Sequence, residues 1–243
     1  QNVAKHVSVV LEKFLEGDQL FLLNQTRKTV CQELCHLRQL LLCQSQMLRP
    51  CENRTNSHYS DAVRIAVFCS SSPTISPENL DLGFLVGATI AQSGHDLVSG
   101  GGRISVMGKI SEGARSHNGR TIGVIPEKLT NLEFADHESS ELIVVEDMRA
   151  RKKLIEELAD AFFVLPGGIG TLEEFFEIWV GRYLGFHNKP IAVIDPHQTY
   201  ATLRTALNHL TETNFMKPGQ HELVEWCNDV KTAMRHISSH YEK

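Results

Sequence analysis

The segment AFFVLPGGIGTLEE, residues 161–174, decides the fold that we predict for this chain. Ala161 to Leu165 form a short apolar run typical of a buried strand, and Pro166 ends that run. Three glycines follow, which let the backbone turn tightly and approach a ligand without a Cβ in the way. Thr171 then begins a helix, whose free N–H groups and positive dipole end favour an anion. Strand, glycine turn and helix N-terminus together predict a phosphate-binding turn.

This turn has three competing interpretations. Glycines can merely cap a connection, but three of them next to Thr171 make that the weaker interpretation. A P-loop does not fit, because no Gly-Lys-Ser or Gly-Lys-Thr follows the glycines. A dinucleotide-binding fingerprint does not fit either, since the motif falls late in the domain. The nearest acidic residue after the following strand, Asp195, is also a poor match for that fingerprint.

Strands and helices alternate from Val63 onward. The predicted strands cover residues 63–69, 96–99, 121–125, 141–145, 161–165 and 190–194. The predicted helices cover residues 77–93, 106–116, 149–159, 171–184 and 200–212. Strands that are apolar on both faces and separated by helices indicate a parallel sheet covered on both sides. With right-handed crossovers this is a Rossmann-like, doubly wound α/β fold, in which ligands bind beyond the carboxyl ends of the strands.

Residues 1–60 have a different pattern. Apolar side chains recur at helical spacing from Val3 to Phe14 and again from Val30 to Leu48, and the residues after Pro50 are polar. We therefore expect an N-terminal helical appendage and linker at residues 1–60, which packs on the main domain or on a partner subunit. The Rossmann-like domain then covers residues 61–243.

Four cysteines and one histidine fall in or near the second helix of the appendage: Cys31, Cys35, His36, Cys43 and Cys51. Cys31 and Cys35 share a helical face, which allows a metal site. No second close pair of Cys or His completes a tetrahedral set, so the favoured interpretation is that these cysteines are small apolar residues. We therefore expect no metal.

The composition is that of an ordinary globular protein, with 42% hydrophobic and 22% charged residues among 243. The formal net charge of −5 gives no general reason to bind nucleic acid or an anionic membrane. No apolar run approaches the roughly 20 residues of a membrane span. The first 15 residues lack the pattern of a signal peptide. We therefore expect a cytoplasmic protein, although Gln1 in place of Met leaves open a segment lost from the start.

Charged residues flank the glycine turn on both sides. Glu173 and Glu174 fall in the first turn of the helix, where solvated surface charge is the usual outcome. A carboxylate near a bound ribose, however, can stabilise the positive charge that builds on C1′ as a glycosidic bond breaks, or can orient water. The segment DMRARKK, residues 147–153, places four cations at a helix start, which the helix dipole disfavours and a bound anion would explain. For Arg149 and Lys153 we expect plain surface charge.

The glycine-rich segment 99–108 repeats the order of strand, glycine turn and helix, and predicts another wall of the same crevice. These three elements together resemble the LONELY GUY family of cytokinin riboside 5′-monophosphate phosphoribohydrolases, many of which were once labelled lysine decarboxylases. The family pattern Pro-Gly-Gly-x-Gly-Thr-x-x-Glu matches Pro166 to Glu174, and Met-x-x-Arg-Lys matches Met148 to Lys152. The resemblance extends from about Arg64 to His209.

The resemblance implies the site residues and the assembly. It assigns the catalytic pair to Arg151 and Glu174. The substrate-binding positions that it implies are Glu133, Met148, Lys152, Gly167, Gly168, Ile169, Gly170, Thr171, Leu172 and Glu173. It also implies a homodimer or larger homo-oligomer with sites near the subunit interface, and neither a metal nor an organic cofactor.

Several positions depart from the family pattern, and they leave the preferred base open. Ile169 stands where Tyr is common, and Val180 stands where many members have Thr. Ser70 and Ser105 replace glycines, and Arg149 replaces a common His.

We expect hydrolysis of a nucleoside 5′-monophosphate to the free base and ribose 5-phosphate. The phosphate would lie at the glycine turn, with Glu174 stabilising the transition state or positioning water and with Arg151 orienting the substrate. A non-catalytic carrier of a nucleotide or molybdopterin is the first alternative. An amino-acid decarboxylase is the second, but it requires a lysine that holds pyridoxal phosphate. A scaffold built around the appendage is the third.

Overall fold

The computed structural model describes residues 62–130 and 134–241. The predicted N-terminal appendage with its four cysteines, and Glu133 among the predicted substrate-binding residues, therefore lie outside the described residues. Among the residues that are described, no helix combines the length and the apolar character that crossing a bilayer requires.

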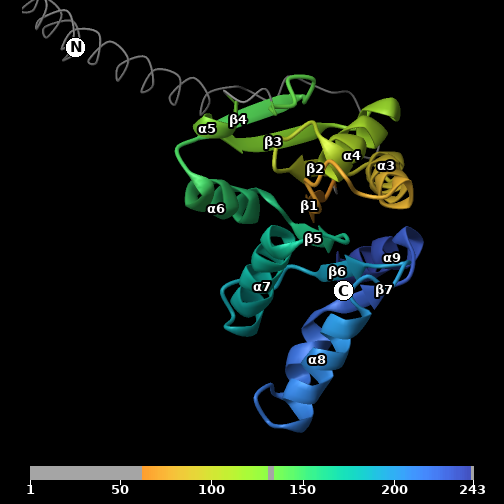
Figure 1. Cartoon of the computed structure of the whole chain (residues 1–243). Coiled ribbons are helices and arrows are strands. Elements are labelled where there is room, and N and C mark those ends of the chain that lie inside the picture. The colour runs from red at the N-terminus through yellow and green to blue at the C-terminus, as the bar shows by residue number, and fades with distance from the viewer. Residues whose placement is uncertain (1–61, 131–133, 242–243) are drawn as a thin grey trace, which may run out of the picture. The chain divides into compact units, whose positions relative to one another are not determined.

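A seven-stranded parallel sheet forms the centre of the domain, with the strand order β4-β3-β2-β1-β5-β6-β7 (Figure 1). Its strands are β1 (Arg64–Phe68), β2 (Asp96–Ser99), β3 (Thr121–Pro126), β4 (Glu141–Val145), β5 (Ala161–Val164), β6 (Ile191–Ile194) and β7 (Glu225–Cys227). The helices are α3 (Pro77–Gln92), α4 (Ser105–Ser116), α5 (Glu127–Thr130), α6 (Met148–Leu158), α7 (Ile169–Tyr183), α8 (Ala201–Glu212) and α9 (Val230–Tyr241), with a 3₁₀ helix at Pro218–Leu223.

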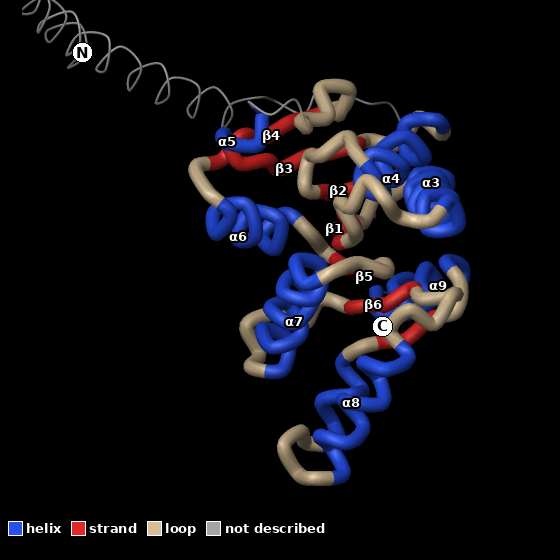
Figure 2. The backbone as a smooth tube through the Cα atoms, viewed as in Figure 1, coloured by secondary structure: helices blue, strands red, loops and turns tan. Residues whose placement is uncertain are grey.

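Helices cover both faces of the sheet (Figures 1 and 2). One apolar core joins α3, α4 and α9 to one face, and a second core joins α6, α7 and α8 to the other. Strand β1 contributes to both, because successive side chains of a strand point to opposite faces. Ile65 and Val67 belong to the first core, and Ala66 and Phe68 belong to the second. The prediction of a doubly wound α/β fold is confirmed.

The six predicted strands and the five predicted helices are all present, with small shifts at their ends. Helix α7 begins at Ile169, inside the glycine turn, rather than at Thr171. Four elements lie outside the predicted ones: α5, the 3₁₀ helix, β7 and α9. Strand β7 has only three residues, so it shows no usable periodicity, and it extends the sheet by pairing with β6.

Strand β1 lies at the point where the chain reverses direction across the sheet. The chain moves from β1 through β2 and β3 to β4, and then returns to β5 on the other side of β1. Ligands of open α/β sheets bind in the crevice outside the carboxyl ends of the strands at such a switch point. The loops that follow β1 and β5 are therefore where a site is expected.

Candidate active site

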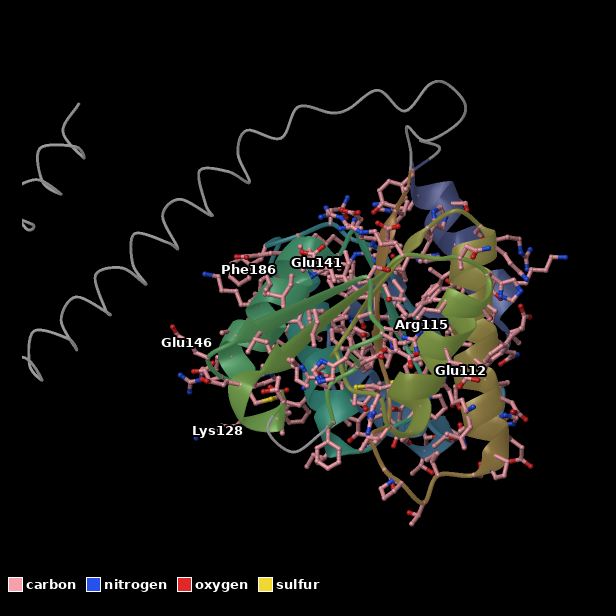
Figure 3. The ribbon with its side chains drawn as sticks, turned by 90° about the horizontal axis from the view of Figure 1, so that it is seen from above. Glu112, Arg115, Lys128, Glu141, Glu146 and Phe186 are labelled. Atoms are coloured by element: carbon pink, nitrogen blue, oxygen red, sulfur yellow. The ribbon has the colours of Figure 1, made fainter. Side chains whose placement is uncertain are left out.

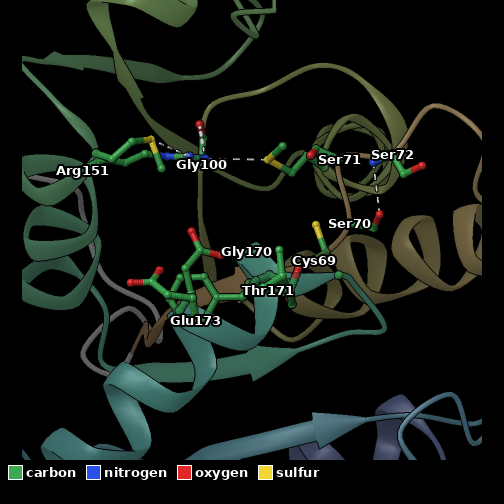
Figure 4. A pocket seen from close by; sticks show the side chains of 16 residues that line it. Cys69, Ser70, Ser71, Ser72, Gly100, Arg151, Gly170, Thr171 and Glu173 are labelled. Carbon is green, nitrogen blue, oxygen red and sulfur yellow. Dashed lines mark hydrogen bonds between the residues drawn. The ribbon is translucent and has the colours of Figure 1, made fainter.

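A cavity of about 410 Å³ opens at this switch point. The loop after β1 contributes Cys69 to Ser72, and the chain after β2 contributes Gly100. The start of α7 forms a further part of the wall, and Figure 4 shows these segments around one space. Met107 of α4, Met148 and Arg151 of α6, and Glu174 of α7 complete the polar and thioether lining.

Arg151 is buried at this cavity, with 8% of its surface exposed. Its Nε donates to the carbonyl oxygen of Val124 (3.1 Å), and its Nη2 donates to that of Gly100 (3.0 Å; Figure 4). A Cβ added at Gly100 would lie 1.6 Å from Nη2, so glycine is required there by the arginine. Burial lowers the pKa of Arg151, and the negative charge of Glu174 opposes that shift. The guanidinium is thus held by one carbonyl oxygen within β3 and by another directly after β2.

The other cations of the 147–153 segment point elsewhere. Arg149 and Lys153 are exposed, as expected, and Lys153 lies 3.8 Å from Glu157 one helical turn on. The carboxylate of Asp147 caps α6 by accepting from the N–H groups of Arg149 and Ala150, both at 2.8 Å. An acceptor at the N-cap partly offsets the unfavourable dipole. Arg151 is the member of this segment whose guanidinium reaches the cavity.

Glu174 also lines the cavity, on the first turns of α7. Burial raises the pKa of its carboxyl to about 7, against the opposing effect of the Arg151 charge. Within the described part of the chain, no hydrogen bond or ion pair holds this carboxylate. A partly buried acid with a shifted pKa and free oxygens is typical of a catalytic group.

The N-terminus of α7 supplies free backbone donors next to Glu174. Leu172 is the first residue to donate into the helix, to the carbonyl oxygen of Gly168 (3.0 Å). The N–H groups of Ile169, Gly170 and Thr171 precede it and have no acceptor within the helix. A Cβ added at Gly168 or Gly170 would meet nothing within 4 Å. The protein's own packing therefore does not require these glycines, which leave the backbone open to a ligand.

Gly167 has a different role from the neighbouring glycines. Its N–H donates to the hydroxyl of Tyr200 (2.8 Å), and a Cβ there would lie 2.2 Å from Oγ1 of Thr171. Gly167 is absent from the cavity wall, and so is Leu172. The structure therefore does not bring these two predicted substrate-binding residues to the cavity. Gly167 shapes the turn, because its only N–H is already used within the protein.

Lys152 is also absent from the cavity wall. Its Nζ binds the carboxylates of Glu173 and of Glu177, the latter at 2.7 Å. Hydrogen bonds to these two acids raise the pKa of Lys152. Lys152 thus links α6 to α7 and holds Glu173, which does line the cavity. The other predicted substrate-binding residues that lie in the cavity wall are Met148, Gly168, Ile169, Gly170 and Thr171.

The sequence analysis missed several residues of the wall. Cys69 to Ser72 directly follow β1, and their position at the carboxyl end of a central strand was the signal that could have found them. Burial and the nearby charge of Glu174 raise the pKa of the Cys69 thiol far above its usual range. Cys69 therefore stays protonated and is a wall residue rather than a nucleophile. The expected wall from segment 99–108 is confirmed by Gly100 and Met107.

Fold and cavity together define a Rossmann-like protein in which an open helix N-terminus, an arginine and a glutamate share one cavity at the switch point. A family model described as "Possible lysine decarboxylase" matches residues 107–237. The chain is 46% identical over 171 residues to a cytokinin riboside 5′-monophosphate phosphoribohydrolase of Mycobacterium tuberculosis, with 70% of this chain and 91% of that protein covered. A phosphoribohydrolase of the same name from Rhodococcoides fascians is 39% identical over 176 residues, with 72% and 89% covered. The chain belongs to this family, the LONELY GUY phosphoribohydrolases.

Solved structures share the fold at lower identity. The molybdenum cofactor binding protein of Rippkaea orientalis has a TM-score of 0.58 and 22% identity, covering 74% of this chain and 98% of that one. The molybdenum cofactor carrier protein of Chlamydomonas reinhardtii also has a TM-score of 0.58, with 21% identity and 75% and 100% covered. Likeness at this level of identity concerns the fold alone.

Proposed function

We propose that this protein hydrolyses the N-glycosidic bond of a nucleoside 5′-monophosphate, either a cytokinin riboside 5′-monophosphate or an AMP-like nucleotide. The products are the free base and ribose 5-phosphate. The observation that carries the proposal is the unpaired carboxylate of Glu174, which shares one cavity with the open N-terminus of α7 and the fixed guanidinium of Arg151. The names of the related phosphoribohydrolases support the same reaction.

The N–H groups of Ile169, Gly170 and Thr171 bind the 5′-phosphate in this proposal, because a helix N-terminus is a ready anion site. The ribose then lies over Glu174. As the bond from C1′ to the base nitrogen breaks, its electron pair leaves with the base, and the carboxylate stabilises the positive charge left on the sugar. Water adds to C1′ and transfers a proton to Glu174, which a pKa of about 7 allows near neutral pH. The leaving base nitrogen takes up a proton from solvent, and Glu174 returns its proton to solvent, so that one water is consumed for each bond cleaved.

Arg151 fixes the other side of the reaction centre. Its Nε and Nη2 donate to carbonyl oxygens, and its Nη1 and Nη2 also contact the sulfur atoms of Met148 (3.7 Å) and Met107 (3.9 Å). Because a thioether sulfur is only a weak acceptor, Nη1 remains available to a substrate. Its positive charge also favours the ionised form of Glu174. Its immobility means that no side-chain freedom is lost when substrate binds.

The first two of the three alternatives, a carrier and a decarboxylase, fit this cavity less well. A pyridoxal phosphate decarboxylase requires a lysine that can form a Schiff base, and the described cavity wall contains no lysine. A nucleotide or molybdopterin carrier has no use for a desolvated, unpaired carboxylate beside its ligand, because a buried charge without a partner costs stability.

The protein acts as a homodimer in this proposal, with the interface beside the cavity. Three exposed apolar side chains lie on one side of α7 and its C-terminal end: Ile169 (89% exposed), Val180 and Leu184. They share a side because a helix has 3.6 residues per turn. Phe186, 78% exposed, follows after Gly185, and Figure 3 labels it at the edge of the domain. Large apolar side chains grouped in this way mark protein interfaces, and a second copy of this helix is the matching partner. Because Ile169 also lines the cavity, the interface would border the site. We also propose a cytoplasmic location, with which the buried free thiols of Cys69 and Cys227 are compatible.

The test is release of free base from a panel of nucleotides that includes AMP and isopentenyl-AMP, followed by chromatography. We expect one or more of them to yield base with the wild-type chain and almost none with Glu174→Gln. Glu157→Gln, which changes an exposed glutamate on α6, serves as the control and should keep full activity. Base release by Glu174→Gln at a rate near that of the wild type would contradict the proposal.

A further inference from the structure

Tyr200 lies behind the phosphate-binding turn and is almost fully buried, with 4% of its surface exposed. Its hydroxyl accepts the N–H of Gly167 (2.8 Å) and lies 3.2 Å from the carbonyl oxygens of both Leu165 and Gly167. One hydroxyl therefore contacts three backbone groups of the turn between β5 and α7. The walls of the cavity do not include Tyr200.

The N–H of Gly167 requires an acceptor from elsewhere in the chain, because neither β5 nor α7 provides one. The N–H of Leu165 still donates to the carbonyl oxygen of Phe68, as in the sheet, and helix α7 begins at Ile169. The N–H of Gly167 falls between the two and is partly buried. A buried backbone N–H without an acceptor is costly, so the position of Gly167 is defined by the Tyr200 hydroxyl.

Tyr200 is itself held in place at the end of the neighbouring strand. Asp195, which directly follows β6 and is buried, accepts the N–H of Thr199 (2.9 Å) and the N–H of Tyr200 (2.8 Å). The ring of Tyr200 packs edge-on against Trp226, with centroids 6.4 Å apart. A continuous chain of contacts therefore runs from the end of β6 through Asp195 and Tyr200 to the turn.

We propose that Tyr200 is a positioning residue for the phosphate: its hydroxyl fixes Gly167, and thereby aims the N–H groups of Ile169, Gly170 and Thr171 at one point in the cavity. This inference rests on the proposed function for the identity of the ligand. Asp195, which does not fit a ribose-binding role, acts here by orienting Tyr200. Because the phosphate is remote from the bond that breaks, loss of this order weakens binding of substrate and product more than it slows the chemical step.

The experiment compares Tyr200→Phe with Tyr241→Phe in the full chain. The hydroxyl of Tyr241 donates to the carbonyl oxygen of Asp160 (2.6 Å), just before β5 and so at the opposite end of the strand from the cavity. Each variant therefore loses one tyrosine hydroxyl that contacts the backbone, but only one of them alters the turn. Binding of ribose 5-phosphate is measured by titration calorimetry, together with kcat, KM and the melting temperature.

We expect Tyr200→Phe to weaken ribose 5-phosphate binding and to raise KM by about tenfold, the order of one hydrogen bond, with a much smaller change in kcat. Tyr241→Phe should lower the melting temperature without either effect. Equal binding by Tyr200→Phe and the wild type, or equal weakening by both variants, would overturn the proposal. If Tyr200→Phe does not fold, Asp195→Asn tests the same chain of contacts and should weaken binding in the same direction; unchanged binding there would count against the proposal.

The outcomes also separate this inference from the proposed function. A wild-type chain that binds ribose 5-phosphate but releases no base would refute the hydrolase, and the comparison of the tyrosine variants would still decide the role of Tyr200. A wild-type chain that binds neither ribose 5-phosphate nor any nucleoside monophosphate would overturn both.

Discussion

Replacing Glu174 with Gln is predicted to stabilise the folded protein while it removes activity. The pKa of Glu174 rises from 4.5 to about 7 on folding, chiefly through burial. Because the folded-state pKa lies above that of the unfolded chain, folding favours the protonated acid. The stability that this preference contributes is fully present below about pH 4.5 and is lost as the pH rises through about 7.

The size of the effect follows from that shift. The rise of the Glu174 pKa from 4.5 to about 7 means that ionising this carboxyl destabilises the folded protein. At pH 8, where the carboxylate is ionised in both the folded and the unfolded state, the loss of unfolding free energy is roughly 3 kcal/mol. At pH 5 the same ionisation destabilises the folded protein by less than about 1 kcal/mol, because the folded-state acid is still protonated. Glutamine has the shape of the protonated acid and no charge, and no hydrogen bond of Glu174 within the described residues is lost. The Glu174→Gln variant should therefore gain roughly 3 kcal/mol at pH 8 and little at pH 5.

Urea unfolding at both pH values measures this difference directly, with the wild type, Glu174→Gln and the exposed control Glu157→Gln. The control should match the wild type at each pH, because a surface carboxylate loses little solvation on folding. A Glu174→Gln variant no more stable than the wild type at pH 8 would refute the reasoning. A gain of equal size at pH 5 and pH 8 would do the same, since it could not come from ionisation.

Four further outcomes are expected. In a pH–rate profile, kcat/KM should rise as the pH increases through about 7, because the ionised form of Glu174 is the active one; a flat profile from pH 5 to 8 would argue against it. Gly100→Ala should displace the Arg151 guanidinium and lower kcat/KM roughly a hundredfold. Normal kinetics of this variant would show that activity does not depend on the position of the guanidinium. Gly168→Ala should keep the wild-type melting temperature but raise KM for nucleotides, because its added Cβ meets no protein atom. Gly167→Ala should lower the melting temperature, because its added Cβ meets the side chain of Thr171. Light scattering should find Leu184→Asp monomeric and the wild type dimeric, and a dimeric variant would move the interface elsewhere.

The sheet could be predicted from the sequence because its signals are local. Each central strand is a short apolar run next to glycine, proline or polar residues, as in Ala161 to Leu165 before Pro166. Strand β7 lacks such a signal: it has only three residues, and its pairing with β6 depends on a register that no local pattern contains.

The site could be predicted only in part, because its decisive contacts join distant residues. Four cations occur between residues 149 and 153, and local spacing cannot tell which of them turns inward. Arg151 does so because carbonyl oxygens 27 and 51 residues away, at Val124 and Gly100, accept its donors. The contact of Tyr200 with Gly167 likewise spans 33 residues and depends on β6 lying next to β5.

The sequence motif does not distinguish the roles of its glycines, whereas the structure gives Gly167 a different role from Gly168 and Gly170. Gly167 is packed against Thr171 and gives its N–H to Tyr200, whereas Gly168 and Gly170 leave open space above the helix N-terminus. A pattern of residue types contains no information about which backbone donors are already used. That difference required the three-dimensional arrangement.

Quantitative product analysis tests the central claim most directly. The full chain is incubated separately with AMP and with isopentenyl-AMP, and the free base, ribose 5-phosphate and inorganic phosphate are measured in the same sample. Cleavage at the glycosidic bond predicts equal amounts of free base and ribose 5-phosphate, no inorganic phosphate, and neither product with Glu174→Gln. Intact nucleotide after prolonged incubation, or inorganic phosphate together with an intact nucleoside, would contradict it.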